Sequence, residues 1–199
     1  MDLRRALNDL KTNKAKGERE AKEPSAPLIE VFHSIQGEGR FVGAPMTFLR
    51  TATCPLRCLY CDTPNSYEAP ATSPVKFGVR TQQEPNPVRA TRAAELVRQV
   101  SQAAMPALKQ PRVSVTGGEP LVFPEFVHAF GKAVRDQGMR LHLETAAIDP
   151  GALERCINQV DHLSADFKLP ETLAEPQRKD LLLMPGRNYG DLHVRCCEV

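Results

Sequence analysis

Short apolar runs that favour β-strands recur along this chain, with helical patterns between several of them. The runs fall at residues 46–50, 113–116, 141–145, 162–167 and 192–199. They are rich in the aliphatic, aromatic and β-branched residues that buried strands favour. Strands that alternate with helices predict parallel strands joined by right-handed crossovers. The pattern therefore predicts an α/β fold.

The expected helices have recognisable ends. Residues 124–134 place their large apolar side chains on one helical face, and Gly138 supplies a stop signal. Asp149 is the expected N-cap of the next helix, with Pro150 at its first position. An earlier helix is expected over residues 91–100.

Length and composition predict one main domain. A chain of 199 residues with 41% hydrophobic content can bury a single sizeable core. Residues 1–27 contain few large apolar groups, so we expect a flexible or helical N-terminal extension there and the core domain over residues 28–199. Residues 64–90 show no period and are expected to form a long loop.

The charge balance favours small ligands over large charged partners. The 26 basic and 24 acidic residues leave a net charge of +2, which implies no large basic field for nucleic acid or an anionic membrane. No apolar run approaches the ~18 residues that span a bilayer, and the N-terminus lacks the apolar region of a secretory signal. We therefore expect a cytoplasmic protein with no nucleic-acid or membrane partner.

Three cysteines, Cys54, Cys58 and Cys61, lie within eight residues on a loop after the strand expected at 46–50. In a reducing cytosol, such closely spaced cysteines indicate metal binding. A closed iron–sulfur cluster takes four cysteines, so three leave one iron open to an outside ligand. The triplet predicts a [4Fe–4S] cluster, and a structural zinc site completed by His33 or Cys196 is the alternative.

The triplet, with Tyr60 before its last cysteine, resembles the signature of the radical SAM (S-adenosylmethionine) superfamily. The Thr-Gly-Gly-Glu-Pro segment at 116–120 resembles the second sequence element of that superfamily. The resemblance implies a partial (β/α) barrel of radical SAM type, with a [4Fe–4S] cluster and SAM as cofactors. It assigns to the SAM pocket a set of residues at or beside expected strand ends: Gly118, Glu119, Glu144, Thr145, Ala146, Ser164, Asp166 and Lys168.

A narrower resemblance, over residues 28–168, is to the 7-carboxy-7-deazaguanine synthase family of queuosine biosynthesis. It rests on the Phe-His-Ser-Ile-Gln-Gly-Glu-Gly stretch at 32–39 and on the arginine that ends the following strand. The resemblance implies a radical SAM lyase that converts 6-carboxy-5,6,7,8-tetrahydropterin to 7-carboxy-7-deazaguanine with loss of ammonia. It also implies a flavodoxin-type electron donor and a homodimer. It places Mg²⁺ on Thr63 and the pterin substrate on Ile35, Gln36, Gly37, Arg50 and Thr116.

The chemistry of Arg50 agrees with that assignment, because a guanidinium binds a carboxylate through two parallel hydrogen bonds. The alternative is an arginine that serves only the surface of its strand. For Glu144 and Lys168, the alternative to a place in the SAM pocket is a structural ion pair between the two side chains.

Two features depart from the family pattern. Ala146 and Ala147 stand where the family commonly has a small polar residue and a glycine. The chain ends at Val199, in or after the expected last strand, whereas relatives continue, so either the barrel is cut short or another chain completes it. Two other functions stay open: a glycyl-radical-enzyme activase, and a zinc- or cluster-bearing binding protein without turnover.

Overall fold

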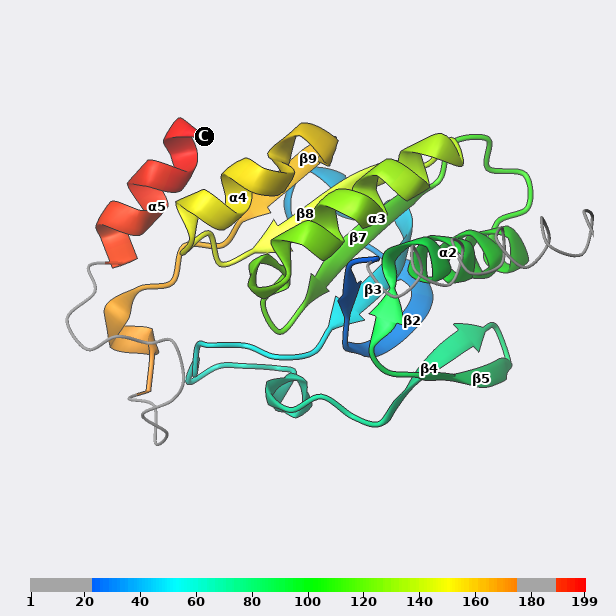
Figure 1. The fold of residues 1–199 in the computed structure, drawn as a ribbon, viewed down its shortest axis with the longest axis horizontal. Coiled ribbons are helices and arrows are strands. Elements are labelled where there is room, and N and C mark those ends of the chain that lie inside the picture. The colour runs from blue at the N-terminus through cyan, green and yellow to red at the C-terminus, as the bar shows by residue number, and fades with distance from the viewer. Residues whose placement is uncertain (1–22, 175–188) are drawn as a thin grey trace, which may run out of the picture.

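The computed structural model describes residues 23–174 and 189–199. Its centre is a seven-stranded sheet in the order β5-β4-β2-β3-β7-β8-β9 (Figure 1). A separate two-stranded pair joins β1 to β6. The strands are β1 (Ser25–Ala26), β2 (Leu28–Ile35), β3 (Pro45–Thr51), β4 (Thr72–Phe77), β5 (Arg80–Pro85), β6 (Val88–Arg89), β7 (Arg112–Gly117), β8 (Arg140–Thr145) and β9 (His162–Ala165).

Strand directions in the sheet are mixed. The four strands β3, β7, β8 and β9 are parallel. β2 runs antiparallel to β3, and β5 antiparallel to β4. Over the described residues, the order ends at β5 on one side and β9 on the other, so the sheet is open. The predicted α/β fold with a partial barrel is confirmed.

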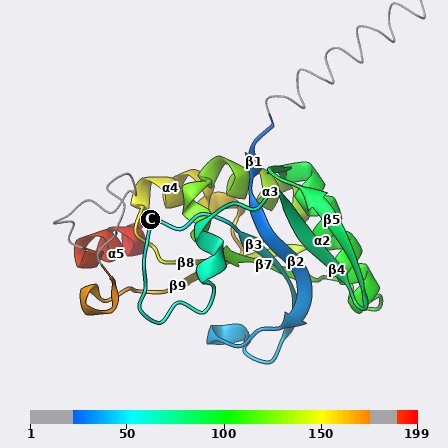
Figure 2. The ribbon, with the colours of Figure 1, turned by 90° about the horizontal axis from the view of Figure 1, so that it is seen from below.

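The helices α2 (Ala90–Ala104), α3 (Pro124–Asp136) and α4 (Pro150–Cys156) lie on one side of the sheet (Figure 2). They bury aliphatic and aromatic side chains against the sheet in one continuous hydrophobic core. In α3, a Cβ on Gly131 would lie 2.7 Å from the Cβ of Gln159, so this glycine lets the helix approach closely. None of the helices at residues 23–174 or 189–199 has the length and apolar character required to cross a membrane.

The expected helix ends are confirmed. The Asp149 carboxylate accepts a hydrogen bond from the Ala152 amide at 2.9 Å, which satisfies an otherwise free N–H at the start of α4. At the end of α3, Gly138 adopts a φ of 75°. This left-handed residue lets the Met139 amide reach the Val134 carbonyl at 3.0 Å. The helix expected over residues 91–100 lies within α2.

The strand predicted at residues 192–199 is wrong, because α5 (Tyr189–Glu198) is a helix. Its buried residues, His193 and Cys196, are three apart, which is a helical spacing. A short apolar run does not by itself distinguish a strand from a buried helical face. The strand predicted at residues 162–167 is correct but ends at Ala165.

The long loop predicted at residues 64–90 is also wrong. A short 3-10 helix (Pro64–Tyr67) is followed by the β4–β5 hairpin and by β6. β5 has no buried residue, so its sequence carries no alternation of apolar and polar residues. The predicted extension at residues 1–27 lies largely outside the described residues, and residues 25–26 form β1 against β6.

Candidate active site

A pocket of about 850 Å³ lies beside the sheet. Side chains from β2, β3, β7, β8 and β9 and from the cysteine loop line it. Ligands gather near the carboxyl ends of parallel strands in α/β folds. Every residue predicted for the site lines this pocket except Thr63, which is hydrogen-bonded to the pocket residue Arg50. The fold therefore brings together residues predicted from distant parts of the sequence.

The cysteine loop begins at Thr53, whose φ of 74° is left-handed. The Thr53 amide donates to the Ser66 carbonyl at 2.6 Å, and its carbonyl accepts from the Glu119 amide at 2.9 Å. A β-branched residue rarely adopts this conformation. These two bonds hold the backbone turned as it leaves β3 and enters Cys54.

Arg57 organises the interior of the same loop. Its Nη1 donates to the carbonyls of Cys54 and Leu56, each at 2.7 Å. The guanidinium carbon lies 3.9 Å from the centre of the Tyr67 ring, a cation–π contact. The backbone from Cys54 to Leu56 is thus held by Arg57 of the same loop.

A later segment of the chain supports the loop from outside. The Leu59 amide donates to the Thr172 carbonyl at 2.9 Å, and the Ala174 amide donates to the Arg57 carbonyl at 2.7 Å. Between these bonds, Cys58 and Leu173 form an isolated antiparallel bridge. No sequence pattern indicated this contact, because it joins two irregular segments.

The three thiols suit a metal centre in their chemistry. Burial raises the pKa of Cys54 to about 12 and also raises the pKa of Cys58, whereas Lys168 acts in the opposite direction on Cys58. The thiols of Cys54 and Cys58 are therefore neutral when free, so metal binding would release their protons. All three cysteines face the pocket, where an exogenous ligand could reach the centre they hold. A [4Fe–4S] cube fits this donor set.

The predicted zinc alternative lacks support from its proposed fourth ligands. Neither His33 nor Cys196 lines the pocket. The Nδ1 atom of His33 is 3.2 Å from the hydroxyl of Thr47, and Cys196 lies in the main core. Across residues 23–174 and 189–199, no three His, Cys, Asp or Glu side chains form a group that could hold one metal ion. A cube distributes its thiolates over different irons, so its ligands need not meet at one point.

The two glycines of the Thr-Gly-Gly-Glu-Pro segment are required by neighbouring backbone. A Cβ on Gly117, whose φ is 128°, would lie 2.3 Å from the Thr51 nitrogen. A Cβ on Gly118 would lie 2.3 Å from the Thr53 oxygen. The tight packing of this segment against the end of β3 therefore explains both glycines.

Glu119 links this segment to the end of β8. One carboxylate oxygen accepts from the Leu121 amide at 2.9 Å and the Thr145 hydroxyl at 2.6 Å, and the other accepts from the Ala146 amide at 2.8 Å. Burial raises the pKa of this carboxyl group, while these hydrogen bonds act against the rise. One oxygen keeps spare acceptor capacity toward a ligand.

A polar network forms part of the pocket wall. Oε1 of Glu144 accepts from Gln36 Nε2 and from the Ser114 hydroxyl, both at 2.6 Å. His142 Nε2 lies 2.8 Å from the Ser164 hydroxyl, and burial lowers the pKa of this histidine. The alternative Glu144–Lys168 pair is wrong, because Lys168 pairs with Asp166.

Sequence reasoning missed Ser114 and His142. Their only signal was the alternation of side chains along a strand. His142 and Glu144 are two residues apart on β8 and so face the same side of the sheet. Both residues are buried. They support Glu144 and Ser164 from below the surface of the pocket.

The double alanine after Glu144-Thr145 keeps an unusual backbone. Ala147 has a φ of 50° and is fully buried. Its amide donates to the Thr145 hydroxyl at 3.1 Å. The position expected to be glycine in the family thus has a conformation that suits glycine, although alanine occupies it.

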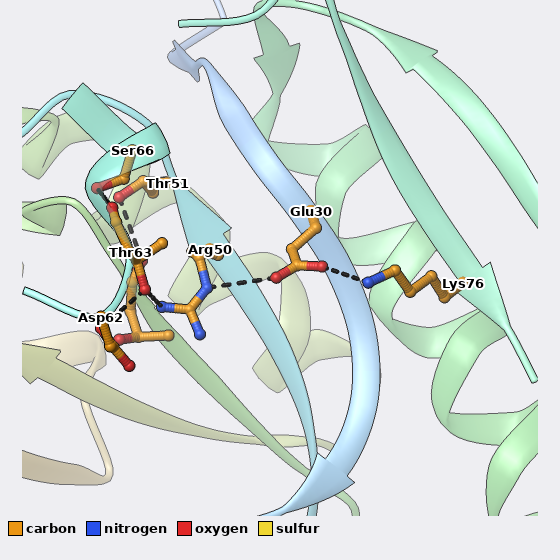
Figure 3. A network of polar contacts seen from close by, with 8 residues as sticks. Glu30, Arg50, Thr51, Asp62, Thr63, Ser66 and Lys76 are labelled. Carbon is orange, nitrogen blue, oxygen red and sulfur yellow. Dashed lines mark hydrogen bonds and ion pairs between the residues drawn. The ribbon is translucent and has the colours of Figure 1, made fainter. Parts of the chain in front are cut away.

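Arg50 is held at the pocket edge by polar contacts (Figure 3). Its Nη1 donates to the Thr63 hydroxyl at 3.2 Å, and that hydroxyl donates to Asp62 Oδ1 at 2.9 Å. Its Nε lies 3.5 Å from Oε1 of Glu30. The positive side chain therefore has neighbours that fix its direction.

Comparison with known proteins gives consistent matches. A 7-carboxy-7-deazaguanine synthase from Methanothermobacter thermautotrophicus is 34% identical over 87% of this chain and 62% of its own length. The enzyme of that name from Geobacter sulfurreducens is 36% identical over 75% of this chain and 60% of its own length. This chain thus spans about three fifths of the length of these relatives.

Among solved structures, QueE from Escherichia coli is 22% identical, with a TM-score of 0.44 over 62% of this chain and 54% of that one. The family profile described as the Radical SAM superfamily matches residues 48–172. That range holds the three cysteines, the Gly-Gly-Glu-Pro turn and the ends of β8 and β9. The chain belongs to the radical SAM superfamily.

Proposed function

We propose that this protein is a 7-carboxy-7-deazaguanine synthase, a radical SAM lyase that acts on 6-carboxy-5,6,7,8-tetrahydropterin and releases ammonia. The observation that carries the proposal is the single pocket that joins the cysteine loop, Arg50 and the Ile-Gln-Gly segment. The relatives that bear this enzyme name support it. When bound, the cluster and SAM supply the electron and the hydrogen-abstracting power that start such a reaction.

Within this proposal, Arg50 binds the carboxylate of the pterin. The side chain lines the pocket and is mostly buried, so a carboxylate there would be shielded from water. Charge-assisted hydrogen bonds of this kind are about twice as strong as neutral ones. Phe32 and Phe48 stack with ring centres 5.2 Å apart and also line the pocket, which provides an apolar surface near Arg50.

SAM would bind at the ends of β7, β8 and β9. Gly118, Glu119, Glu144, Ser164 and Asp166 offer backbone groups, carboxylates and a hydroxyl there. These groups are acceptors for an ammonium or for ribose hydroxyls. The side-chain amide of Gln36 already donates a hydrogen bond to Glu144. Its side chain therefore links the proposed substrate and SAM regions.

Mg²⁺ would bind beside Asp62 and Thr63. Their carboxylate and hydroxyl oxygens are 2.9 Å apart, and oxygen is the donor that Mg²⁺ prefers. The cation of Arg50 is hydrogen-bonded to the same hydroxyl and opposes a second cation. The site therefore suits Mg²⁺ only when the substrate carboxylate adds negative charge between them.

The flavodoxin-type electron donor, the homodimer and the cytoplasmic location expected from the sequence belong to the same proposal. The support for the electron donor and the homodimer is the family resemblance, whereas the location is expected from the sequence composition.

The proposal is tested by turnover. Protein reconstituted without oxygen is given dithionite, SAM, Mg²⁺ and 6-carboxy-5,6,7,8-tetrahydropterin, and the products are separated by liquid chromatography and mass spectrometry. We expect 7-carboxy-7-deazaguanine and ammonia in equal amounts. SAM cleavage to 5′-deoxyadenosine without the deazaguanine product would contradict the proposed substrate but keep the radical SAM assignment.

A further inference from the structure

Three charged side chains form a row across adjacent strands. Lys76 lies on β4, Glu30 on β2 and Arg50 on β3 (Figure 3). Glu30 and Arg50 are direct cross-strand partners, and Arg50 is in turn the partner of Thr116 on β7. The row therefore runs from β4 across β2 to Arg50, which lines the pocket. Its charges alternate in sign, so neighbouring side chains attract one another.

The middle carboxylate is bonded unequally to its two cations. Oε2 of Glu30 accepts a hydrogen bond from Lys76 Nζ at 2.6 Å, whereas Oε1 lies 3.5 Å from Arg50 Nε. Arg50 Nε is buried and makes no hydrogen bond with the described residues. Glu30 is thus directed to Lys76, and its contact with Arg50 is mainly electrostatic.

This arrangement leaves most N–H donors of Arg50 without a hydrogen bond to the described residues. In the described part of the chain, its guanidinium makes one hydrogen bond, from Nη1 to Thr63. A guanidinium has five N–H donors. With Nε buried and one Nη1 donor bonded to Thr63, the other Nη1 donor and the two on Nη2 remain for a carboxylate that enters the pocket. Glu30 is a carboxylate already within reach and is the natural competitor.

We infer that Lys76 draws one oxygen of Glu30 to itself and so keeps Glu30 from forming a full two-bond pair with Arg50, which leaves guanidinium donors free for the carboxylate of a ligand. Lys76 and Glu30 are then positioning residues that set the affinity for carboxylated pterins. The inference rests on the proposed function, since it takes the carboxypterin as the ligand of Arg50. Without Lys76, both oxygens of Glu30 can turn to Arg50 and occupy it.

The test compares two pterins on the same reconstituted protein. Fluorescence titration without oxygen measures the dissociation constants of 6-carboxypterin, an unreactive aromatic form of the substrate, and of pterin, which lacks the carboxylate. The variants are Lys76→Met, Glu30→Gln and the double variant. Lys132→Met is the matched control, because Lys132 is also an exposed lysine paired with a carboxylate, 2.7 Å from Asp136 on the outer helix α3.

We expect Lys76→Met to raise the dissociation constant of 6-carboxypterin ~10-fold, the scale of one charge-assisted bond, and to leave pterin binding unchanged. Glu30→Gln removes the competitor, so it alone should bind 6-carboxypterin at least as tightly as the parent. The double variant should return to within ~3-fold of the parent, because the competing charge is gone. Lys132→Met should match the parent with both pterins.

The inference would be overturned by a Lys76→Met variant that binds 6-carboxypterin like the parent, or by a double variant that fails to recover. Glu30→Gln that weakens binding as much as Lys76→Met would also overturn it, since Glu30 would then support Arg50 instead of competing for it. A parent protein that binds 6-carboxypterin no better than pterin would instead contradict the proposed function. Lys76 is half exposed, so the fold should tolerate its replacement.

Discussion

Thr53 and Gly118 are in backbone contact, and through them the cysteine loop meets the Gly-Gly-Glu-Pro turn. A Cβ on Gly118 would lie 2.3 Å from the Thr53 carbonyl oxygen, which itself accepts a hydrogen bond from the Glu119 amide. The two sequence elements that indicated a radical SAM protein are therefore one packed unit. A substitution that moves the backbone of one element should therefore displace the other.

Gly118→Ala should disrupt this unit. The new methyl group would overlap backbone atoms that cannot move aside, so we expect a loss of about 1–3 kcal/mol in the free energy of unfolding. Cluster loading should fall as well, because Cys54 follows Thr53 directly. Urea unfolding and iron analysis measure the two effects.

Gly151→Ala is the control for that substitution. The nearest atom to a Cβ on Gly151 would be 3.6 Å away, an ordinary contact, and the residue lies in helix α4. Alanine has a higher helix propensity than glycine. The stability of the variant should therefore be equal or higher, and its iron content unchanged. Equal losses in both variants would contradict the close contact of Gly118 with Thr53.

Thr53→Gly should stabilise the protein. Relief of the left-handed conformation is worth ~1–2 kcal/mol, and the greater freedom of glycine in the unfolded chain costs about 0.5–1 kcal/mol. We expect a net gain of ~0.5–1 kcal/mol, measured by urea unfolding of the parent and the variant in parallel. A clear loss would mean that the threonine side chain contributes contacts that outweigh its strained backbone.

The strands β3, β7, β8 and β9 and the helices α2, α3 and α4 were predictable because their apolar pattern is strong, whereas β4, β5 and β6 fall in residues that were expected to form a loop. The positions of Cys54, Glu144 and Ser164 were predictable in outline, since they lie on the cysteine motif or on strands that share one edge. α5 was mistaken for a strand because its apolar run is short. The contacts of Glu30 with Lys76 and of His142 with Ser164 depend on which strands become neighbours, and local sequence does not carry that information.

Buried histidines should make stability depend on pH. Burial lowers the pKa of His142, with His162 and Arg112 acting in the same direction and Glu144 against them. The unfolded chain then binds protons that the folded protein resists, so stability present above the ordinary pKa of ~6.5 is lost as the pH falls below it. One such histidine contributes at most ~1.4 kcal/mol per pH unit.

His142→Gln should reduce that dependence. Urea unfolding of the parent and the variant at several pH values between 7.5 and 5, a range that brackets the ordinary histidine pKa, would measure how the free energy of unfolding depends on pH. We expect a shallower fall for the variant over the acidic half of the range. Identical slopes would show that His142 takes up its proton equally well in the folded and unfolded states.

Arg50→Lys tests the geometry of carboxylate binding. Lysine keeps the charge but cannot form two parallel hydrogen bonds, so the KM for 6-carboxy-5,6,7,8-tetrahydropterin should rise ~10-fold or more. 5′-Deoxyadenosine release without substrate should change much less. A similar loss in both activities would assign Arg50 to the structure of β3 and the Thr63 loop.

The most direct test of the account is the metal content of the cysteine site. Anaerobically reconstituted protein is analysed for iron, sulfide and zinc, beside a Cys58→Ala variant treated in the same way. We expect about four irons and four sulfides per chain in the parent, as one cube requires, and a severe loss of both in the variant. One zinc per chain with no iron, or equal iron in parent and variant, would contradict it.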